Sequence, residues 1–290
     1  RVDAVPFENR DWRVGFYFNI AHNENKITEM PDNYTEENYT FNNGEYAYRR
    51  EEGRPMGSFY GYRYKGVCQN KDATYARDAD GNVMKDISGN AIVMRNGTAT
   101  IAPGDALYED INHDGVINQY DIVYLGNSNP RFTGGAGVNV SYKQFKLSAI
   151  FYGRYGQDVV NSTRLNNESM RGIDNQSTAV LRRWRNEGDQ TDIPRALYGE
   201  GYNTLGSDRF VEDASYLRLK SLSFNYRLPK KIIQRWGFSN IDVYVTGYNL
   251  FTWTKYTGQD PEVKTENTYA RDSATTPASI QLVAGFNLSF

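Results

Sequence analysis

The sequence is poor in cysteine and histidine. Its 290 residues include one cysteine, Cys68, so no disulfide can form within the chain. The two histidines, His22 and His113, give little support to a histidine-based metal site or catalytic triad. The Gly-x-Ser-x-Gly, Walker and His-Glu-x-x-His motifs are also missing. These absences disfavour an enzyme, and paired carboxylates for glycoside hydrolysis are the catalytic arrangement that stays open.

Long apolar runs and a strong charge of either sign are missing too. No segment approaches the roughly 20 consecutive apolar residues of a membrane-spanning helix. This excludes helical spans but not a membrane β-barrel, whose alternating strands average to a polar composition. The formal net charge of −2 does not indicate the clustered basic face that nucleic-acid binding requires.

Aromatic residues, by contrast, are abundant. They make up 14% of the chain, and 23 of them are tyrosines. Tyrosine suits the two interfaces of a membrane because its ring is apolar and its hydroxyl is polar. It suits sugar binding and ordinary β-sandwiches as well, so this enrichment alone does not choose between them.

Alternation of apolar and polar residues predicts an all-β chain. In the last twelve residues, every second residue from Ile280 to Phe290 is apolar, and Val283 is the one apolar residue on the other face. A change of phase near Lys220-Ser221 predicts a β-bulge. The predicted strands cover residues 12–20, 58–66, 135–142, 145–152, 210–226, 241–251 and 279–290.

The connections between these strands alternate in length. Residues 143–144 and 227–240 form short links, whereas 157–208 and 252–278 form long polar loops, the first with a predicted helix over 177–188. Outer-membrane barrels have short turns on the periplasmic side and long loops outside. A β-sandwich need not sort its loops in this way. The pattern therefore favours a transmembrane antiparallel β-barrel segment with long extracellular loops.

One segment within residues 68–130, a stretch rich in turn residues, has the spacing of a calcium-binding loop. Oxygen-bearing side chains stand at loop positions 1, 3, 5, 9 and 12, glycine stands at position 6, and position 7 offers a backbone carbonyl. The candidate ligands of a structural Ca²⁺ are Asp110, Asn112, Asp114, the Val116 carbonyl, Asn118 and Asp121.

This loop departs from the EF-hand pattern at two points. Position 12 is Asp121, which is shorter than the usual bidentate glutamate, and Pro103-Gly104 stands where a preceding helix would run. The alternative is a turn rich in Asp and Asn that is closed by its own hydrogen bonds. If calcium binds, the loop predicts a structural clip and not a catalytic metal.

Several blocks of sequence resemble, in order, the carboxy-terminal region of SusC/RagA-type TonB-dependent outer-membrane transporters, and the resemblance spans essentially the whole chain. The final Gly285-Phe-Asn-Leu-Ser-Phe290 is similar to the signal that the barrel-assembly machinery reads. The other blocks are Asn23–Ile27, Glu52–Pro55, Tyr60–Tyr62, Gly126–Pro130, Thr191–Arg195, Ser207–Lys220, Tyr226–Pro229, Gly247–Leu250 and Tyr256–Glu262.

This resemblance implies that residues 1–290 form about a third of a 22-stranded barrel in the bacterial outer membrane. The plug domain and the TonB-contacting segment are expected outside this chain. The implied function is TonB-dependent import of oligomeric nutrients, with oligosaccharides preferred and oligopeptides as the alternative, and no enzymatic activity. The implied partners are a SusD-like surface lipoprotein as a lid, TonB, the substrate and the lipid bilayer.

Two rivals from other classes stay open at this point. A surface β-sandwich that binds glycans and carries a calcium clip would use the same alternating strands and the same acidic loop. A secreted glycan hydrolase would require a carboxylate pair that the sequence does not single out.

Overall fold

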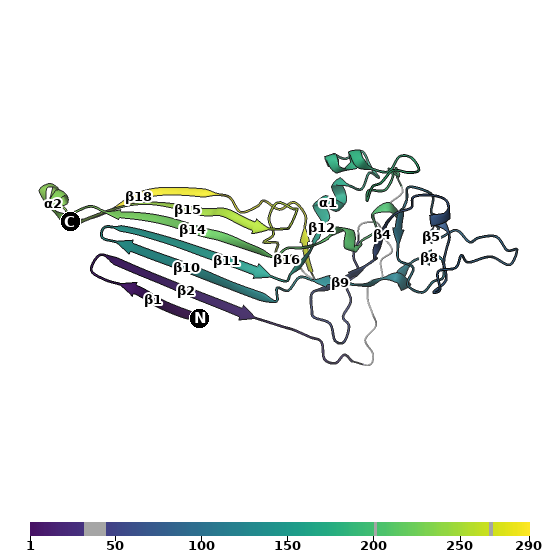
Figure 1. The fold of residues 1–290 in the computed structure, drawn as a ribbon, viewed down its shortest axis with the longest axis horizontal. Helices are drawn as coiled ribbons and strands as arrows, with labels where there is room; N and C mark the ends of the chain where they lie inside the picture. Colours follow the sequence, from purple (N-terminus) through teal and green to yellow (C-terminus); the bar gives the residue numbers. More distant parts are fainter. Residues whose placement is uncertain (32–44, 200–201, 267–268) are drawn as a thin grey trace.

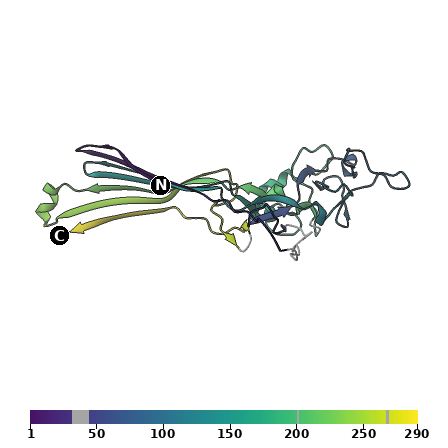
Figure 2. The ribbon, with the colours of Figure 1, turned by 90° about the horizontal axis from the view of Figure 1, so that it is seen from below.

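The computed structural model describes residues 1–31, 45–199, 202–266 and 269–290. Its largest element is a seven-stranded antiparallel sheet with the strand order β1-β2-β10-β11-β14-β15-β18, which lies beside a separate lobe (Figure 1). Seen from below, the sheet is a single curved layer (Figure 2). The strands are β1 Val2–Glu8, β2 Trp12–His22, β10 Phe132–Tyr142, β11 Phe145–Tyr155, β14 Tyr216–Arg227, β15 Asn240–Thr254 and β18 Gln281–Ser289.

The register of the sheet follows the alternation in the sequence. β10 pairs with β11 from Phe132↔Tyr155 to Tyr142↔Phe145, so Lys143-Gln144 is a two-residue hairpin connection. The predicted bulge is confirmed, because the pairing of β14 shifts between Leu219 and Ser221. The strands at 12–20, 135–142, 145–152, 241–251 and 279–290 are confirmed as well.

The two faces of this sheet differ in polarity. One face carries large apolar side chains that stay exposed, from 39% for Phe132 to 75% for Leu282, and we call it the outward face. The opposite, inward face carries polar contacts such as the hydrogen bonds of Ser148 with Asn139 and of Ser223 with Thr246. No part of the described chain covers this apolar face. A face of this kind indicates contact with an apolar partner, either lipid or another protein surface.

The connections sort by length onto the two ends of the sheet. The links 9–11, 143–144 and 228–239 lie at the end away from the lobe, where the short helices α2 Lys230–Ile233 and η6 Gln234–Trp236 also lie (Figure 1). The long connections form the lobe at the other end. This arrangement matches the alternation of loop lengths in the sequence.

The lobe is built from short strands and helices. Its largest sheet has the order β13-β12-β17-β16, and the others are β6-β5-β8, β3-β9 and β4-β7. Within the described residues no helix is long and apolar enough to cross a membrane. The strands and the larger helices are β3 Ser58–Gly61, β4 Tyr64–Val67, β5 Arg95–Asn96, β6 Ala99–Thr100, β7 Ala106–Tyr108, β8 Val116–Ile117, β9 Val123–Asn127, β12 Asp158–Asn161, β13 Val211–Asp213, β16 Thr265–Glu266, β17 Tyr269–Asp272, α1 Ser162–Asn167 and η3 Thr178–Arg182.

The buried core of the protein lies in this lobe and is rich in tyrosine. One cluster contains Tyr60, Tyr62 and Tyr108, and a second contains Tyr46 and Phe59. Burial raises the pKa of the Tyr108 hydroxyl. The same hydroxyl oxygen accepts a hydrogen bond from the Leu205 amide. The aromatic content is therefore divided between the core of the lobe and the two ends of the sheet, where pairs such as Trp12 with Tyr142 and Phe251 with Trp253 lie.

Three sequence-based expectations are wrong in detail. Residues 58–66 do not form one strand, because β3 pairs with β9 and β4 pairs with β7. The helix predicted over 177–188 is the 3-10 helix η3; Ser177 does cap it, but the Trp184 amide then bonds to the Ile193 carbonyl and ends it before Gly188. The strand predicted over 210–226 is interrupted after β13, which pairs with β12.

Candidate functional site

Three blocks of sequence that lie far apart in the chain meet where the sheet joins the lobe. The Asn25 side-chain oxygen accepts a hydrogen bond from the Met56 amide at 2.7 Å, and the Asn129 side-chain amide donates to the Met56 carbonyl. The backbone of Ile27 pairs with that of Arg54. These bonds bring residues 22–27, 53–56 and 124–131 together around a cavity of about 350 Å³, which we call the junction pocket.

The lining of the junction pocket is polar and carries both signs of charge. His22, Glu24, Lys26 and Arg131 contribute ionisable side chains, and Tyr124 contributes a ring. The size lies within the range of small-ligand sites, and mixed amide and charged groups suit a polar solute with several hydrogen-bonding groups. In the sequence, Glu24 and Lys26 stood out only as members of one block, and Tyr124 and Arg131 belonged to none. Nothing local to any block showed that they share one cavity.

A second convergence lies on the inward face of the sheet. The Arg218 side chain on β14 is 3% exposed; one terminal nitrogen lies 2.8 Å from a Glu262 oxygen, and the other contacts Asp260. Lys220 also reaches Glu262 at 2.8 Å, and the Arg218 Nε donates to the Thr252 hydroxyl. We call these residues the Arg218 cluster. It fastens the loop between β15 and β18 to the strands.

The electrostatics of the Arg218 cluster favour the charged form of Asp260. Burial by itself would raise the pKa of Asp260. Hydrogen bonds from the Ala278 and Glu262 amides and the Arg218 guanidinium outweigh burial and lower that pKa below its ordinary value of 3.8. Asp260 is therefore ionised at neutral pH and binds the guanidinium as a full charge.

The lobe contains a further ion-pair network around Glu168. Arg209 and Glu168 are buried and lie 2.8 Å apart, and Arg164 bridges Glu168 to Glu212 at 3.0 and 3.2 Å. Glu212 also accepts hydrogen bonds from Thr257. The same loop is thus held by charged groups at two places, which limits its movement relative to the sheet.

The residues predicted as calcium ligands form a compact loop whose polar groups bond to one another. The Asp110 carboxylate accepts from the Gly115 amide at 2.8 Å, and Gly115 has a positive φ of 81°. Asn112 donates to Asp114 at 2.9 Å, and the Asp114 carboxylate accepts from the Val116 amide. Asp110, Asn112 and Asp114 are therefore adjacent.

The other three predicted ligands face their own backbone. Asp121 is fully buried, and its two oxygens accept from the Ile111 and Asn118 amides, both at 2.8 Å. Burial, and then the nearby charges of Asp110 and Asp114, raise the pKa of Asp121 against these hydrogen bonds. The Val116 carbonyl accepts from the Asn118 side chain at 3.0 Å. Across the described residues no group of three or more His, Cys, Asp or Glu side chains converges as a metal site.

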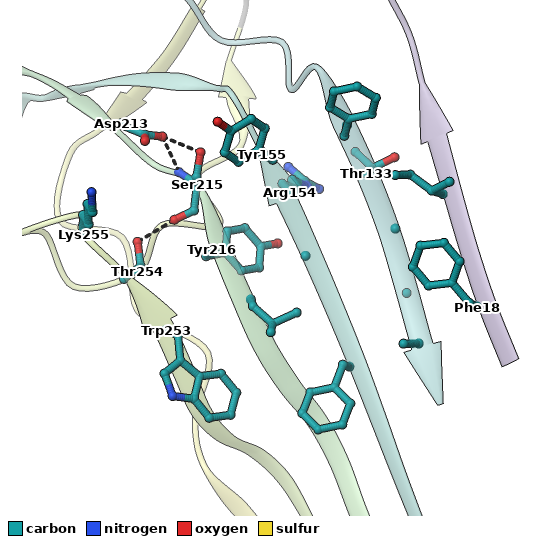
Figure 3. A pocket seen from close by; sticks show the side chains of 18 residues that line it. Phe18, Thr133, Arg154, Tyr155, Asp213, Ser215, Tyr216, Trp253, Thr254 and Lys255 are labelled. Carbon is teal, nitrogen blue, oxygen red and sulfur yellow. Dashed lines mark hydrogen bonds between the residues drawn. The ribbon is translucent and has the colours of Figure 1, made fainter. Parts of the chain in front are cut away.

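An apolar depression of about 670 Å³ lies on the outward face near the lobe (Figure 3). Its lining comes from β2, β10, β11, β14 and β15, and includes Phe18 and Trp253. Lys255 and Asp213 lie at the end nearest the lobe. No local pattern in the sequence indicated this depression, because each strand contributes only a few positions to it.

Comparison with known proteins connects these features to one family, although no family model matches the chain. The chain is 32% identical over 276 residues to TonB-dependent receptor P3 of Formosa agariphila, a match that covers 92% of this chain and 25% of that protein. It is 24% identical over 299 residues to the TonB-dependent receptor SusC of Bacteroides thetaiotaomicron, covering 100% of this chain and 26% of SusC.

Among solved structures, the chain matches a protein of the RagAB peptide transporter. The TM-score is 0.68 at 26% identity, over 99% of this chain and 28% of that one. The chain belongs to the SusC/RagA type of TonB-dependent receptor. It spans about a quarter of the length of these relatives. The seven-stranded sheet of this SusC/RagA-type chain is a segment of a β-barrel wall, and the named relatives are receptors and transporters.

Proposed function

We propose that this chain forms wall and outer loops of a TonB-dependent importer in the bacterial outer membrane, as the carboxy-terminal part of one barrel domain. The observation that carries the proposal is the sheet itself: its outward face is apolar and exposed, and its long connections gather at one end. Contact between such an apolar face and lipid has little cost in free energy, whereas its exposure to water is unfavourable. The lobe then stands outside the cell.

The proposed mechanism involves no covalent chemistry by this chain. A surface lipoprotein of the SusD type closes over the lobe and traps a solute. TonB, acting on a plug segment that lies outside this chain, then opens the path inward. The junction pocket and the loop held by the Arg218 cluster lie where the lobe meets the barrel wall, so they would line the route below the lid.

The proposed substrate is an oligomeric polar nutrient. The amide and charged groups of the junction pocket, together with the ring of Tyr124, suit the hydroxyls and ring faces of an oligosaccharide. An oligopeptide is the second candidate, because the chain is similar in fold to a protein of a peptide transporter. Calorimetry of the full-length receptor with its lipoprotein against oligosaccharide and oligopeptide panels tests the choice. Binding of neither panel would contradict both assignments.

The bilayer assignment has a direct test in two residues of equal exposure. Val138 and Ile150 are both 40% exposed and lie at the centres of neighbouring strands, but on opposite faces of the sheet. In the full-length receptor, Val138→Arg should cost about 2–4 kcal/mol of barrel stability, since the charge would lie in hydrocarbon. Ile150→Arg points inward and should cost much less.

The measurement is the free energy of unfolding of the receptor reconstituted in lipid vesicles, with heat-modifiable mobility as the check that the barrel has formed. Equal losses for the two variants would contradict the assignment of the outward face to lipid. A soluble β-sandwich would instead lose stability from whichever arginine enters its core.

We also propose that the Asp110–Asp121 loop binds Ca²⁺ as a structural clip. Asp110, Asn112 and Asp114 already lie together and offer the hard oxygen ligands that calcium prefers. Asp121 and the Val116 carbonyl would exchange their present hydrogen bonds for the cation. Asp110→Ala and Asp114→Ala should abolish calcium heat in titration calorimetry of the full-length receptor, while Asp86→Ala in a neighbouring turn should not. Unchanged heats in the first two variants would leave the self-bonded turn as the correct description.

A further inference from the structure

The depression on the outward face is a gap in the rows of side chains across the sheet. Cross-strand pairing places Ile20, Gly134, Gly153, Leu217 and Trp253 in one continuous row over five strands. The two adjacent glycines leave the centre of this row without side chains. Ile20 and Leu217, which flank the two glycines, are 58% and 47% exposed, so they stand as walls on either side, and Trp253 lies beyond Leu217.

The neighbouring row deepens the gap towards the middle of the sheet. Ala136 lies two residues further along β10 and pairs with Phe18 and Phe151. Ala136 carries only a methyl group there, whereas Phe18 and Phe151 carry rings, and all three residues line the depression; Figure 3 shows the ring of Phe18. From Ala136 to Phe132 the floor runs for about 14 Å along the strand, at ~3.4 Å per residue. This shape is long, narrow and apolar.

The end of the groove nearest the lobe is polar. Lys255, two residues beyond Trp253, is exposed and forms no ion pair with any residue that the structure describes. The Asp213 carboxylate at the same end is engaged by the amide and hydroxyl of Ser215 (Figure 3). A cation beside an apolar groove, at the level where strand gives way to loop, complements an anionic group attached to an acyl chain.

We propose that this groove binds one acyl chain of a membrane lipid with a phosphate headgroup, and that Lys255 contacts the phosphate. The inference rests on the proposed function, in which the outward face meets the bilayer. Elsewhere in the described sheet no two glycines pair across neighbouring strands, and single small residues such as Ala149 stand beside large ones, so annular lipid meets no comparable gap. In the groove an acyl chain gains contacts on its floor and both walls, and the headgroup reaches a fixed charge.

Ala136 and Ala149 offer a matched pair of variants for the test. Both are half-buried alanines on the outward face of neighbouring strands, but only Ala136 lines the groove. Ala136→Leu fills the floor, and Ala136→Val fills it partly, whereas Ala149→Leu adds the same volume outside it. The purified full-length receptor is titrated in detergent with dioleoylphosphatidylglycerol or with dioleoylglycerol, which lacks the phosphate. Native mass spectrometry counts the lipids bound.

If the groove is a lipid site, we expect one tightly bound phosphatidylglycerol per wild-type receptor. Ala136→Leu should weaken it by about 10-fold, with Ala136→Val between, and Ala149→Leu should leave it unchanged. Lys255→Gln should weaken phosphatidylglycerol by about 5-fold, near the ~1 kcal/mol per cation close to a membrane surface, and leave dioleoylglycerol unaffected. Equal binding by wild type and Ala136→Leu, with both variants folded by heat-modifiable mobility, would overturn the site. Equal losses of both lipids in Lys255→Gln would overturn the phosphate contact.

The outcomes separate this site from the proposed function. If Val138→Arg destabilises the receptor and Ile150→Arg does not, the outward face meets lipid, and a negative result for Ala136→Leu removes the groove alone. If the two arginine variants behave alike, the bilayer assignment itself fails, and the groove fails with it. A lipid that binds equally well to every variant would be annular lipid without a site.

Discussion

Replacing Arg218 with methionine should free the loop that follows β15 without unfolding the sheet. Methionine keeps much of the buried apolar stem but removes the guanidinium that contacts Asp260, Glu262 and Thr252. The two carboxylates then lose their main counter-charge, and among the described residues Lys220 is the one cation that still reaches Glu262. The loss therefore falls on the loop and much less on the hydrogen bonds between strands.

The size of the effect follows from the burial of the pair. Removing one partner of a fully buried ion pair costs roughly 3–5 kcal/mol. The side chains of Asp260 and Glu262 are 16% and 28% exposed, and water can solvate part of the charge left behind. We therefore expect about 2–3 kcal/mol for local opening of the loop. At ~1.4 kcal/mol per factor of ten, exchange of its amides should quicken by about 30- to 150-fold.

Hydrogen exchange on the full-length receptor measures this directly. The reporter amides are those of Glu262 and Ala278, which both donate to Asp260 at 2.9 Å. Arg227→Met is the matched control, because Arg227 lies on the same strand and pairs with Asp242, but its side chain is 64% exposed. A surface pair of this kind is worth about 0–1 kcal/mol. Wild-type exchange at both reporter amides in Arg218→Met, or equal loosening by the control, would refute the reasoning.

Two further predictions concern the lobe. Gly104→Ala should destabilise it by about 2–4 kcal/mol, because φ is +91° and the new Cβ would lie 2.3 Å from the Trp184 ring. Gly89→Ala is the control: its φ is +83° but the space around it is open, so it should cost only about 1 kcal/mol. Limited proteolysis of the lobe compares them, and equal protection would contradict the packing argument. Burial raises the pKa of the Cys68 thiol to about 11, so at pH 8 its thiolate fraction should be about 100-fold below that of a free thiol; rapid alkylation of the native receptor would contradict this.

Local sequence patterns were sufficient to predict those elements that pair with a segment close to them in the sequence. β10 and β11 are joined by two residues, so the alternation of each strand and the short link between them predicted both the hairpin and its faces. The bulge in β14 was visible as a change of phase within one strand. The turn of the acidic loop was visible as well, since Gly115 and the backbone bonds to the Asp110 and Asp121 carboxylates lie within Asp110–Asp121.

Local patterns failed where a distant segment changed the outcome. η3 stops early because the Trp184 amide finds the Ile193 carbonyl, and the aromatic run at 58–66 divides because its two halves pair with different strands. The junction pocket and the Arg218 cluster each join segments that are separated by tens of residues. The periodicity of a single segment carries no information on such long-range contacts.

The sequence by itself determined most of the long strands of the sheet, the apolar side of each of them, and which connections are long, because side chains alternate with a period of two whatever the strand pairs with. Only the tertiary structure decided which strands and loops are neighbours in space. The groove exists because pairing aligned Gly134 with Gly153 between Ile20 and Leu217. A gap between side chains belongs to the register of several strands at once, and no single strand encodes it.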